Sequence, residues 1–127
     1  DPGLIREGVA PKSPGMKYKH YAPRAQMTIV EGDRPRPVIE ELIERARREG
    51  KRVAVLSAGP REYAAEFLLD GGADAEQYAA RLFDALREFD EMGADEIFAE
   101  LPFGDAGIAP AVRNRIYKAA GGNVIKC

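Results

Sequence analysis

The side chains best suited to chemistry lie in one short strip, residues 13–23, which reads SPGMKYKHYAP. Two lysines, two tyrosines and the one histidine of the chain stand there between prolines: Lys17, Tyr18, Lys19, His20 and Tyr21. Prolines hold their neighbours extended. An extended strip of rings and cations suits a nucleotide, because lysines attract phosphates, rings stack on a base, and phenol or imidazole groups donate hydrogen bonds. The same tyrosines could instead dock a linker onto a neighbouring domain, and the residues alone leave both interpretations open.

The remainder of the sequence lacks the common motifs of catalysis and phosphate binding. It contains neither G-x-x-x-x-G-K-[ST] nor G-x-G-x-x-G. The glycine-containing segments 71–74 and 104–107 each precede an expected helix, but each carries an aspartate that would repel an anion, so we interpret both as turns. One histidine and one cysteine, far apart in the sequence, argue against a zinc site or a Cys–His pair. Glu96 and Glu100 fall on one face of an expected strand, where we expect them to be solvent-facing or ion-paired.

Charge and proline divide the chain into an arm and a body. Residues 1–26 hold five basic and two acidic side chains, whereas residues 27–127 hold 14 basic and 19 acidic ones. Six of the nine prolines lie in the first 37 residues. We therefore expect an extended basic linker arm, 1–26, followed by an acidic globular domain, 27–127. The arm is either an ordinary solvated linker or a segment that meets a polyanion such as the phosphates of a nucleotide.

Length and composition narrow the class of protein. A chain of 127 residues, 45% of them hydrophobic, is long enough for one domain with a core. The single cysteine is the last residue, so no intrachain disulfide can form. Neither a membrane-spanning apolar run nor a signal peptide is evident, and we therefore expect no membrane contact and a cytoplasmic location. The proline-rich start without an initiator methionine suggests a piece of a longer protein.

Apolar periodicity predicts alternating strands and helices. Strands are expected at 27–31, 52–56, 66–69, 96–101 and 124–125, helices at about 35–49, 75–92 and 108–120, and one helical turn at 61–65. Asp33 is expected to cap the first helix, and Asp74 with Gln77 resembles a capping box for the second. The spacing of Arg87 and Asp90 predicts an ion pair on that second helix. This order of elements predicts an α/β layered domain with a short, mostly parallel sheet.

Three segments resemble the long, two-domain form of L-threonylcarbamoyladenylate synthase. The strip at 13–23 is similar to the linker signature of that family, S/A-P-G-M-K-Y-x-H-Y-x-P, at every fixed position. The sequence LFDALREFD at 82–90 resembles its L-[FY]-x-A-L-R-x-x-D helix. The sequence GIAPAVRNR at 107–115 resembles its G-[IL]-x-x-A-[IV]-x-N-R segment. The resemblance extends over residues 13–126.

The resemblance implies a function for the arm rather than for the body. In that family an N-terminal catalytic domain condenses threonine, bicarbonate and ATP into threonylcarbamoyl-AMP and pyrophosphate, and the product feeds the t6A37 modification of tRNA. The C-terminal domain is Rossmann-like, and the linker folds over the active site as a lid. This chain would then be the linker, 1–26, and a Rossmann-like three-layer accessory domain, 27–127. A tyrosine of the strip, Tyr18 or Tyr21, would contact ATP or the adenylate, with Lys17 and His20 as near neighbours.

The favoured hypothesis is therefore a lid and regulatory region that is inactive by itself. Its partners would be the N-terminal catalytic domain of the same protein, ATP and threonylcarbamoyl-AMP. No cofactor, metal or catalytic residue is assigned to the chain, and ATP with Mg²⁺ is a substrate of the complete enzyme. An alternative is an autonomous module that binds a nucleotide or phosphate at the carboxyl edge of the sheet, near 57–61 and 104–107. A third possibility is a protein- or tRNA-interaction domain, although the acidic balance of 27–127 argues against direct tRNA binding.

Overall fold

Five strands form one sheet in a computed structural model that describes residues 21–104 and 107–127. The elements, in chain order, are β1 (Gln26–Glu31), α1 (Pro35–Arg48), β2 (Val53–Ser57), β3 (Phe67–Asp70), α2 (Ala75–Met92), β4 (Glu96–Leu101), α3 (Pro110–Ala119) and β5 (Val124–Lys126). The strand order is β3-β2-β4-β1-β5, and every neighbouring pair is parallel. The predicted α/β fold is confirmed, with a sheet that is wholly rather than mostly parallel.

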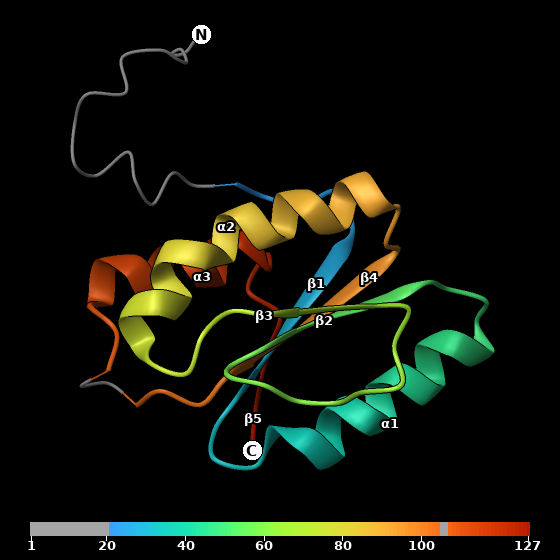
Figure 1. The fold of residues 1–127 in the computed structure, drawn as a ribbon, viewed down its shortest axis with the longest axis horizontal. Helices are drawn as coiled ribbons and strands as arrows, with labels where there is room; N and C mark the ends of the chain where they lie inside the picture. Colours follow the sequence, from blue (N-terminus) through green and yellow to red (C-terminus); the bar gives the residue numbers. More distant parts are fainter. Residues whose placement is uncertain (1–20, 105–106) are drawn as a thin grey trace, which may run out of the picture.

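Helices cover both faces of the sheet, α1 on one face and α2 with α3 on the other (Figure 1). The core on the α1 side contains Val30, Ile39, Ile43, Ala46, Val53, Val55 and Phe98. The core on the α2 side includes Ile29, Leu56, Leu82, Leu86, Phe89 and Ile97. Successive residues of one strand, such as Ile29 and Val30, point into different cores, because side chains alternate across a sheet. This arrangement confirms the three layers and explains the unbroken apolar runs of the strands.

The helix α2 forms as its sequence predicts. Oδ1 of Asp74 accepts a hydrogen bond from the Gln77 amide at 2.8 Å, which caps the first turn. Gly93 ends the helix with φ of 89°, in the left-handed region that favours glycine. Every residue predicted to face inward is buried: Tyr78, Leu82, Phe83, Leu86 and Phe89. No helix within the described residues, α2 included, is both long and apolar enough to cross a bilayer.

The start of α1 differs from the prediction. Arg34 rather than Asp33 occupies the N-cap position, and no side chain accepts a capping hydrogen bond there. The helix begins instead with Pro35, which has no N–H to satisfy and whose φ already suits a helix. The predicted role of Asp33 was wrong because a proline start reduces the need for a cap.

Residues 58–66 join the parallel strands β2 and β3 without a helix, so the helical turn predicted at 61–65 was wrong. Exposure alternates residue by residue from 62 to 70, as it does in an extended chain. Two arginines of α1 bind the carbonyl groups of this crossover: Arg36 donates to Glu62 O at 2.8 Å, and Arg47 donates to Ala64 O at 3.0 Å. These tertiary contacts outweigh the local helical preference.

Replacement of a core residue of α2 should cost a large part of the stability. Phe89 is fully buried, and Phe89→Ala is expected to lower the free energy of unfolding by about 3–5 kcal/mol, because it leaves a cavity between α2 and the sheet. Leu68→Ala, on the edge strand β3 where the side chain is 36% exposed, serves as the control and should change it by less than about 1 kcal/mol. Urea denaturation of the 127-residue chain measures both. Equal losses would contradict the packing described.

Candidate functional site

Residues 21–25, near the end of the predicted linker, are bound to α2 through Asp90. The Tyr21 hydroxyl donates a hydrogen bond to Oδ2 of Asp90 at 2.6 Å. The Arg24 amide donates to the same oxygen at 2.8 Å, and the Ala25 amide donates to Oδ1 at 3.1 Å. Asp90 is 6% exposed, so both oxygens of a nearly buried carboxylate are engaged by the linker. We call Asp90, Tyr21, Arg24 and Ala25 the Asp90 clamp.

Arg87 lies beside the Asp90 clamp but does not form the predicted ion pair with Asp90. Its Cζ lies over the Tyr21 ring, 5.3 Å from the centroid, and its Nη1 is 2.8 Å from Oδ1 of Asp84. The prediction was wrong because three donors from the linker already occupy the carboxylate of Asp90. A cation–π contact at an exposed site contributes about 0.5–1 kcal/mol. Arg87 therefore covers one face of the ring and adds to the attachment of Tyr21.

The Asp90 clamp shifts the acidity of both of its titratable partners. Burial alone would raise the pKa of Asp90, but the hydrogen bonds from Tyr21, Arg24 and Ala25 outweigh burial and hold that pKa below its ordinary value of 3.8. The hydrogen bond to Asp90, followed by burial, raises the pKa of Tyr21 above its ordinary value of 10.0. At neutral pH the phenol is thus a stable donor and the carboxylate a stable acceptor.

Tyr21 is the one residue of the predicted nucleotide-contacting set that lies within the described part of the chain. Its ring packs against the core on the α2 side, and its hydroxyl is bonded to Asp90. Lys17, Tyr18 and His20 lie outside the described residues. The nucleotide contact of the strip therefore stays a prediction.

Asp90 is the functional candidate that sequence reasoning missed. The sequence did contain a signal for it, since Asp90 follows Leu82 and Leu86 at helical spacing on the buried stripe of α2. A carboxylate in such a position must find hydrogen-bond partners, because burying it unpaired is costly. The identity of the partners was not accessible, because the closest of them is 65 residues away in the sequence.

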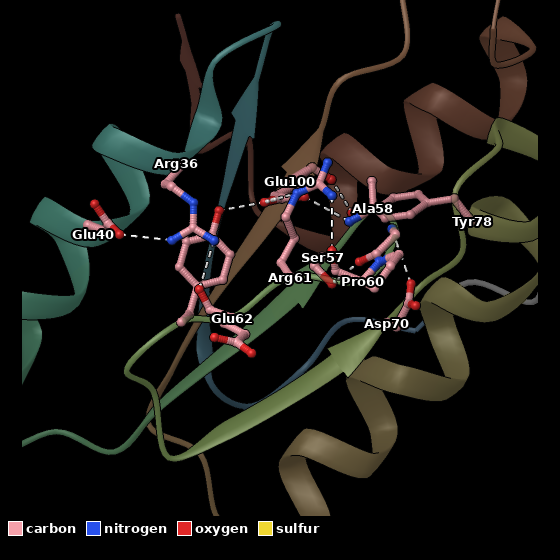
Figure 2. Close-up of polar contacts among 12 residues, drawn as sticks. Arg36, Glu40, Ser57, Ala58, Pro60, Arg61, Glu62, Asp70, Tyr78 and Glu100 are labelled. Atoms are coloured by element: carbon pink, nitrogen blue, oxygen red, sulfur yellow. Dashed lines mark hydrogen bonds and ion pairs between the residues drawn. The ribbon is translucent and has the colours of Figure 1, made fainter.

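A second polar cluster lies at the carboxyl ends of β2 and β4, around Glu100 (Figure 2). Glu100 is fully buried; its Oε1 accepts from the Ala58 amide at 2.8 Å and its Oε2 accepts from the Tyr63 hydroxyl at 2.5 Å. Nε of Arg61 is 3.7 Å from Oε2. The expectation that Glu100 is ion-paired is met, but burial of the whole side chain was not foreseen. Glu96 is ion-paired as well, at 3.8 Å from Nζ of Lys51.

At this edge of the sheet, carboxylates of the protein accept hydrogen bonds from backbone amides that could otherwise bind an anion. Oδ1 of Asp70 accepts from the Gly59 amide at 3.1 Å and from the Gly72 amide at 2.8 Å. The Ala58 amide is bound by Glu100, and the first turn of α2 is capped by a side chain, as described above. These donors therefore already have acceptors, and the turns after β2 and β3 present no ready phosphate cradle.

The Glu100 cluster has the character of a structural network. Burial, followed by the hydrogen bond to Glu100, raises the pKa of Tyr63 well above its ordinary value of 10.0, so the phenol stays protonated and keeps donating. Within residues 21–104 and 107–127 no three His, Cys, Asp or Glu side chains are grouped so that they could hold a metal ion. The cluster therefore fixes the β2–β3 crossover to the end of β4.

The family profile described as "Threonylcarbamoyl-AMP synthase, C-terminal domain" matches residues 3–121 of the chain. The chain belongs to this family. The predicted resemblance is thereby confirmed at the level of the C-terminal domain.

Relatives of this synthase family cover the chain almost completely. The threonylcarbamoyl-AMP synthase of Bacillus subtilis (strain 168) is 45% identical over an alignment of 130 positions, which covers 99% of this chain and 37% of that protein. The threonylcarbamoyl-AMP synthase of Pyrococcus abyssi (strain GE5 / Orsay) is 45% identical over 117 residues, 91% of this chain and 34% of that protein. The crystal structure of P. abyssi Sua5 complexed with L-threonine superposes with a TM-score of 0.75 and 42% identity, over 100% of this chain and 37% of that one. This chain thus spans little more than a third of the length of these relatives.

One similar structure consists of the C-terminal domain alone. The crystal structure of the C-terminal Sua5 domain from a Pyrococcus horikoshii protein has a TM-score of 0.68 and 34% identity. The match covers 84% of this chain and 100% of that one. A related C-terminal domain has thus been crystallised as a separate chain.

The pKa shifts predict that the Asp90 clamp is insensitive to pH between about 5 and 9. Because the pKa of Asp90 is lowered, the stability that its carboxylate gives the folded state is fully present above pH 3.8. It is lost as the pH falls through the lowered pKa. Because the pKa of Tyr21 is raised, the stability that its phenol gives the folded state is fully present below pH 10.0. It is lost as the pH rises through the raised pKa. Hydrogen exchange of the Arg24 and Ala25 amides, corrected for intrinsic rates, measures this. Protection that changes between pH 5 and pH 9 would contradict it.

Removal of the Glu100 carboxylate should loosen the β2–β3 crossover. Glu100→Met leaves the Ala58 amide and the Tyr63 hydroxyl without acceptors. Each unpaired buried group costs about 1–3 kcal/mol, so we expect a loss of about 2–6 kcal/mol in the free energy of unfolding. Glu96→Met is the matched control on the same strand face, expected to cost less than about 1 kcal/mol. Urea denaturation provides the measurement. Equal effects of the two substitutions would be incompatible with the buried network.

Proposed function

We propose that this chain is the linker and C-terminal domain of a threonylcarbamoyl-AMP synthase and that it holds a lid over the reaction of a catalytic domain. That reaction would join threonine, bicarbonate and ATP into threonylcarbamoyl-AMP and pyrophosphate, for the t6A modification of tRNA. The observation that carries the proposal is the Asp90 clamp, which fixes the C-terminal end of the basic tyrosine strip to the body. In that enzyme this domain would hold the lid in position, and the catalytic domain would carry out the reaction.

The relatives support this assignment. They are named threonylcarbamoyl-AMP synthases, and the chain matches about a third of each. One solved relative is described as complexed with L-threonine, which agrees with an enzyme that uses threonine as a substrate. The threonine and nucleotide sites are assigned to the part of the protein outside this chain, together with ATP and its Mg²⁺.

The proposed lid works through charge and exclusion of water. Lys17 and Lys19 would attract the phosphates, whereas Tyr18 and His20 would stack on or hydrogen-bond to the nucleotide. A carbamoyl-adenylate hydrolyses readily, so a strip that covers it would protect the product before release. The strip can act in this way only if its two ends are placed, and the Asp90 clamp places the end that joins the body.

The body is proposed as a scaffold, since the described residues favour neither alternative function. Binding of a nucleotide or phosphate at the carboxyl edge would need free amides, and those of Ala58, Gly59 and Gly72 are bound by carboxylates. Residues 105–106 of the segment 104–107, the other half of that predicted site, lie outside the described residues. Binding of tRNA would need clustered cations, whereas residues 27–127 carry five more acidic than basic side chains.

Threonine-dependent release of pyrophosphate from ATP tests the proposal. The 127-residue chain alone should show none, and the full-length synthase should show it. One tyrosine of the strip, Tyr18 or Tyr21, is expected to stack on the base, which contributes about 1–3 kcal/mol, so the full-length variant with Tyr18→Ala and Tyr21→Ala should lose about fivefold to 150-fold in kcat/KM for ATP. The exposed Lys118→Ala on α3 is the control and should behave as the parent. Normal kinetics of the double variant would remove the lid role.

A further inference from the structure

We propose that the groove between α1 and the β2–β3 crossover binds an extended peptide segment of a protein partner, in which a basic and an acidic side chain stand two residues apart. The groove has a volume of about 570 Å³, within the range of about 300–1,000 Å³ that is typical of ligand sites. Its lining consists of Glu40, Ile43, Glu44, Arg47 and Arg48 of α1 and residues 62–64 of the crossover. We call it the crossover groove. The inference goes beyond the scaffold role and does not depend on the lid.

Arginines hold the two walls of the crossover groove together. Arg36 donates to Oε2 of Glu40 at 2.9 Å and to Glu62 O at 2.8 Å, so it joins the helix to the crossover (Figure 2). Its guanidinium also lies over the Tyr63 ring, 4.6 Å from the centroid. Arg47 makes the second bridge from α1 to the crossover, as described above. Because both bridges form within the chain itself, the walls are in place before a partner binds, which lowers the cost of binding.

The crossover presents a run of backbone donors that the fold leaves unused. The amides of residues 61–65 donate no hydrogen bond to another group within the described part of the chain. The arginines bind carbonyl oxygens of this segment, Glu62 O and Ala64 O, and not its N–H groups. An extended segment with unpaired amides binds peptides by strand addition, because carbonyl groups of the peptide become the acceptors. The crossover offers such a segment beside a groove.

Apolar atoms of the crossover groove suit the stem of a long side chain. Ile43 of α1 is 4% exposed, Tyr63 is partly buried against the core on the α1 side, and Ala64 is exposed. Lysine and arginine side chains lay their methylene groups on such surfaces while the charged end stays in water or meets a carboxylate. A basic side chain of a bound peptide therefore finds both of its requirements in this groove.

The unpaired charges of the crossover groove favour a cationic group over a phosphate. Glu40 and Arg47 each have an ion-pair partner elsewhere in the chain. The side chains of Glu44, Glu62 and Arg48 are exposed and form no ion pair with any other residue that the structure describes. Two free carboxylates against one free guanidinium attract a basic side chain and repel a nucleotide or a nucleic acid.

The spacing of the charges on α1 matches that of an extended peptide. Glu44 and Arg48 are four residues apart on α1, which is about 6 Å along the helix axis. In an extended chain, side chains two residues apart point to the same face and are separated by about 6.5–7 Å. A basic and an acidic side chain at this separation would meet Glu44 and Arg48 in turn. Glu62, on the other wall, adds to the attraction for the basic one.

Selection of peptides on the full-length synthase tests this inference. Random peptides of about ten residues, displayed on phage, are selected on the immobilised enzyme, and the Kd of each selected peptide is measured by fluorescence anisotropy. The test variant combines Glu44→Lys with Glu62→Lys. The matched control combines Glu76→Lys with Glu88→Lys, which makes the same change of charge at exposed positions of α2, on the other face of the sheet. Hydrogen exchange with and without peptide locates the contact.

The expected peptides contain a basic and an acidic residue two positions apart. The variant with Glu44→Lys and Glu62→Lys should raise their Kd by about tenfold or more, because like charges brought together oppose binding. The control variant should stay within about twofold of the parent. Bound peptide should slow the exchange of the amides of residues 61–65 and leave that of Arg24 and Ala25 unchanged.

Several outcomes would overturn the inference. A selection that enriches no peptide would do so, as would peptides that bind the variant with Glu44→Lys and Glu62→Lys as tightly as the parent. Unchanged exchange at residues 61–65 would do so as well, and this measurement needs only the parent enzyme if the variant fails to fold. A dimer in sedimentation velocity that dissociates in that variant would assign the groove to a second copy instead. The lid is tested separately, by release of pyrophosphate.

Discussion

Backbone amides outside the strand ladders and helices must still find acceptors, and in this domain carboxylates provide many of them. Six carboxylates among the described residues accept from backbone N–H groups: Glu66, Asp70, Asp74, Asp90, Asp95 and Glu100. They act at the linker root, at both ends of β2, at the turn after β3 and at the start of α2. Some of the acidic side chains of the body therefore bind the backbone of the same domain.

The same chemistry gives the two ends of the sheet different roles. At the carboxyl ends of β4 and β3, Glu100 and Asp70 accept hydrogen bonds from the amides of Ala58, Gly59 and Gly72. Beside the amino end of β1, Asp90 binds the linker. The segment that precedes β1 is therefore firmly placed. This placement agrees with the scaffold role proposed for the domain.

Most of the fold could be predicted from the sequence, because the elements that define it are periodic. The apolar stripe of α2 and the unbroken run of β2 are local patterns, and both formed as predicted. The segment 61–65 could not be predicted, since arginines from α1, distant in sequence, bind its carbonyls. For the same reason the partners of Asp90 and Glu100 could not be predicted, although Asp90 stands on the buried stripe of α2, where burial could be inferred. Local pattern identified the elements, and contacts across the chain determined the sites.

The place of the Asp90 clamp has a mechanical consequence. The clamp lies directly before β1, an interior strand held by β4 on one side and β5 on the other. When two parts of a larger protein move apart, tension along the arm would arrive first at the α2 carboxylate, where three hydrogen bonds share it. These three hydrogen bonds would bear the force before it reached the pairing of β1 with β4 and β5. Along the chain, the Asp90 clamp therefore stands between residues 21–25 and the paired strand β1.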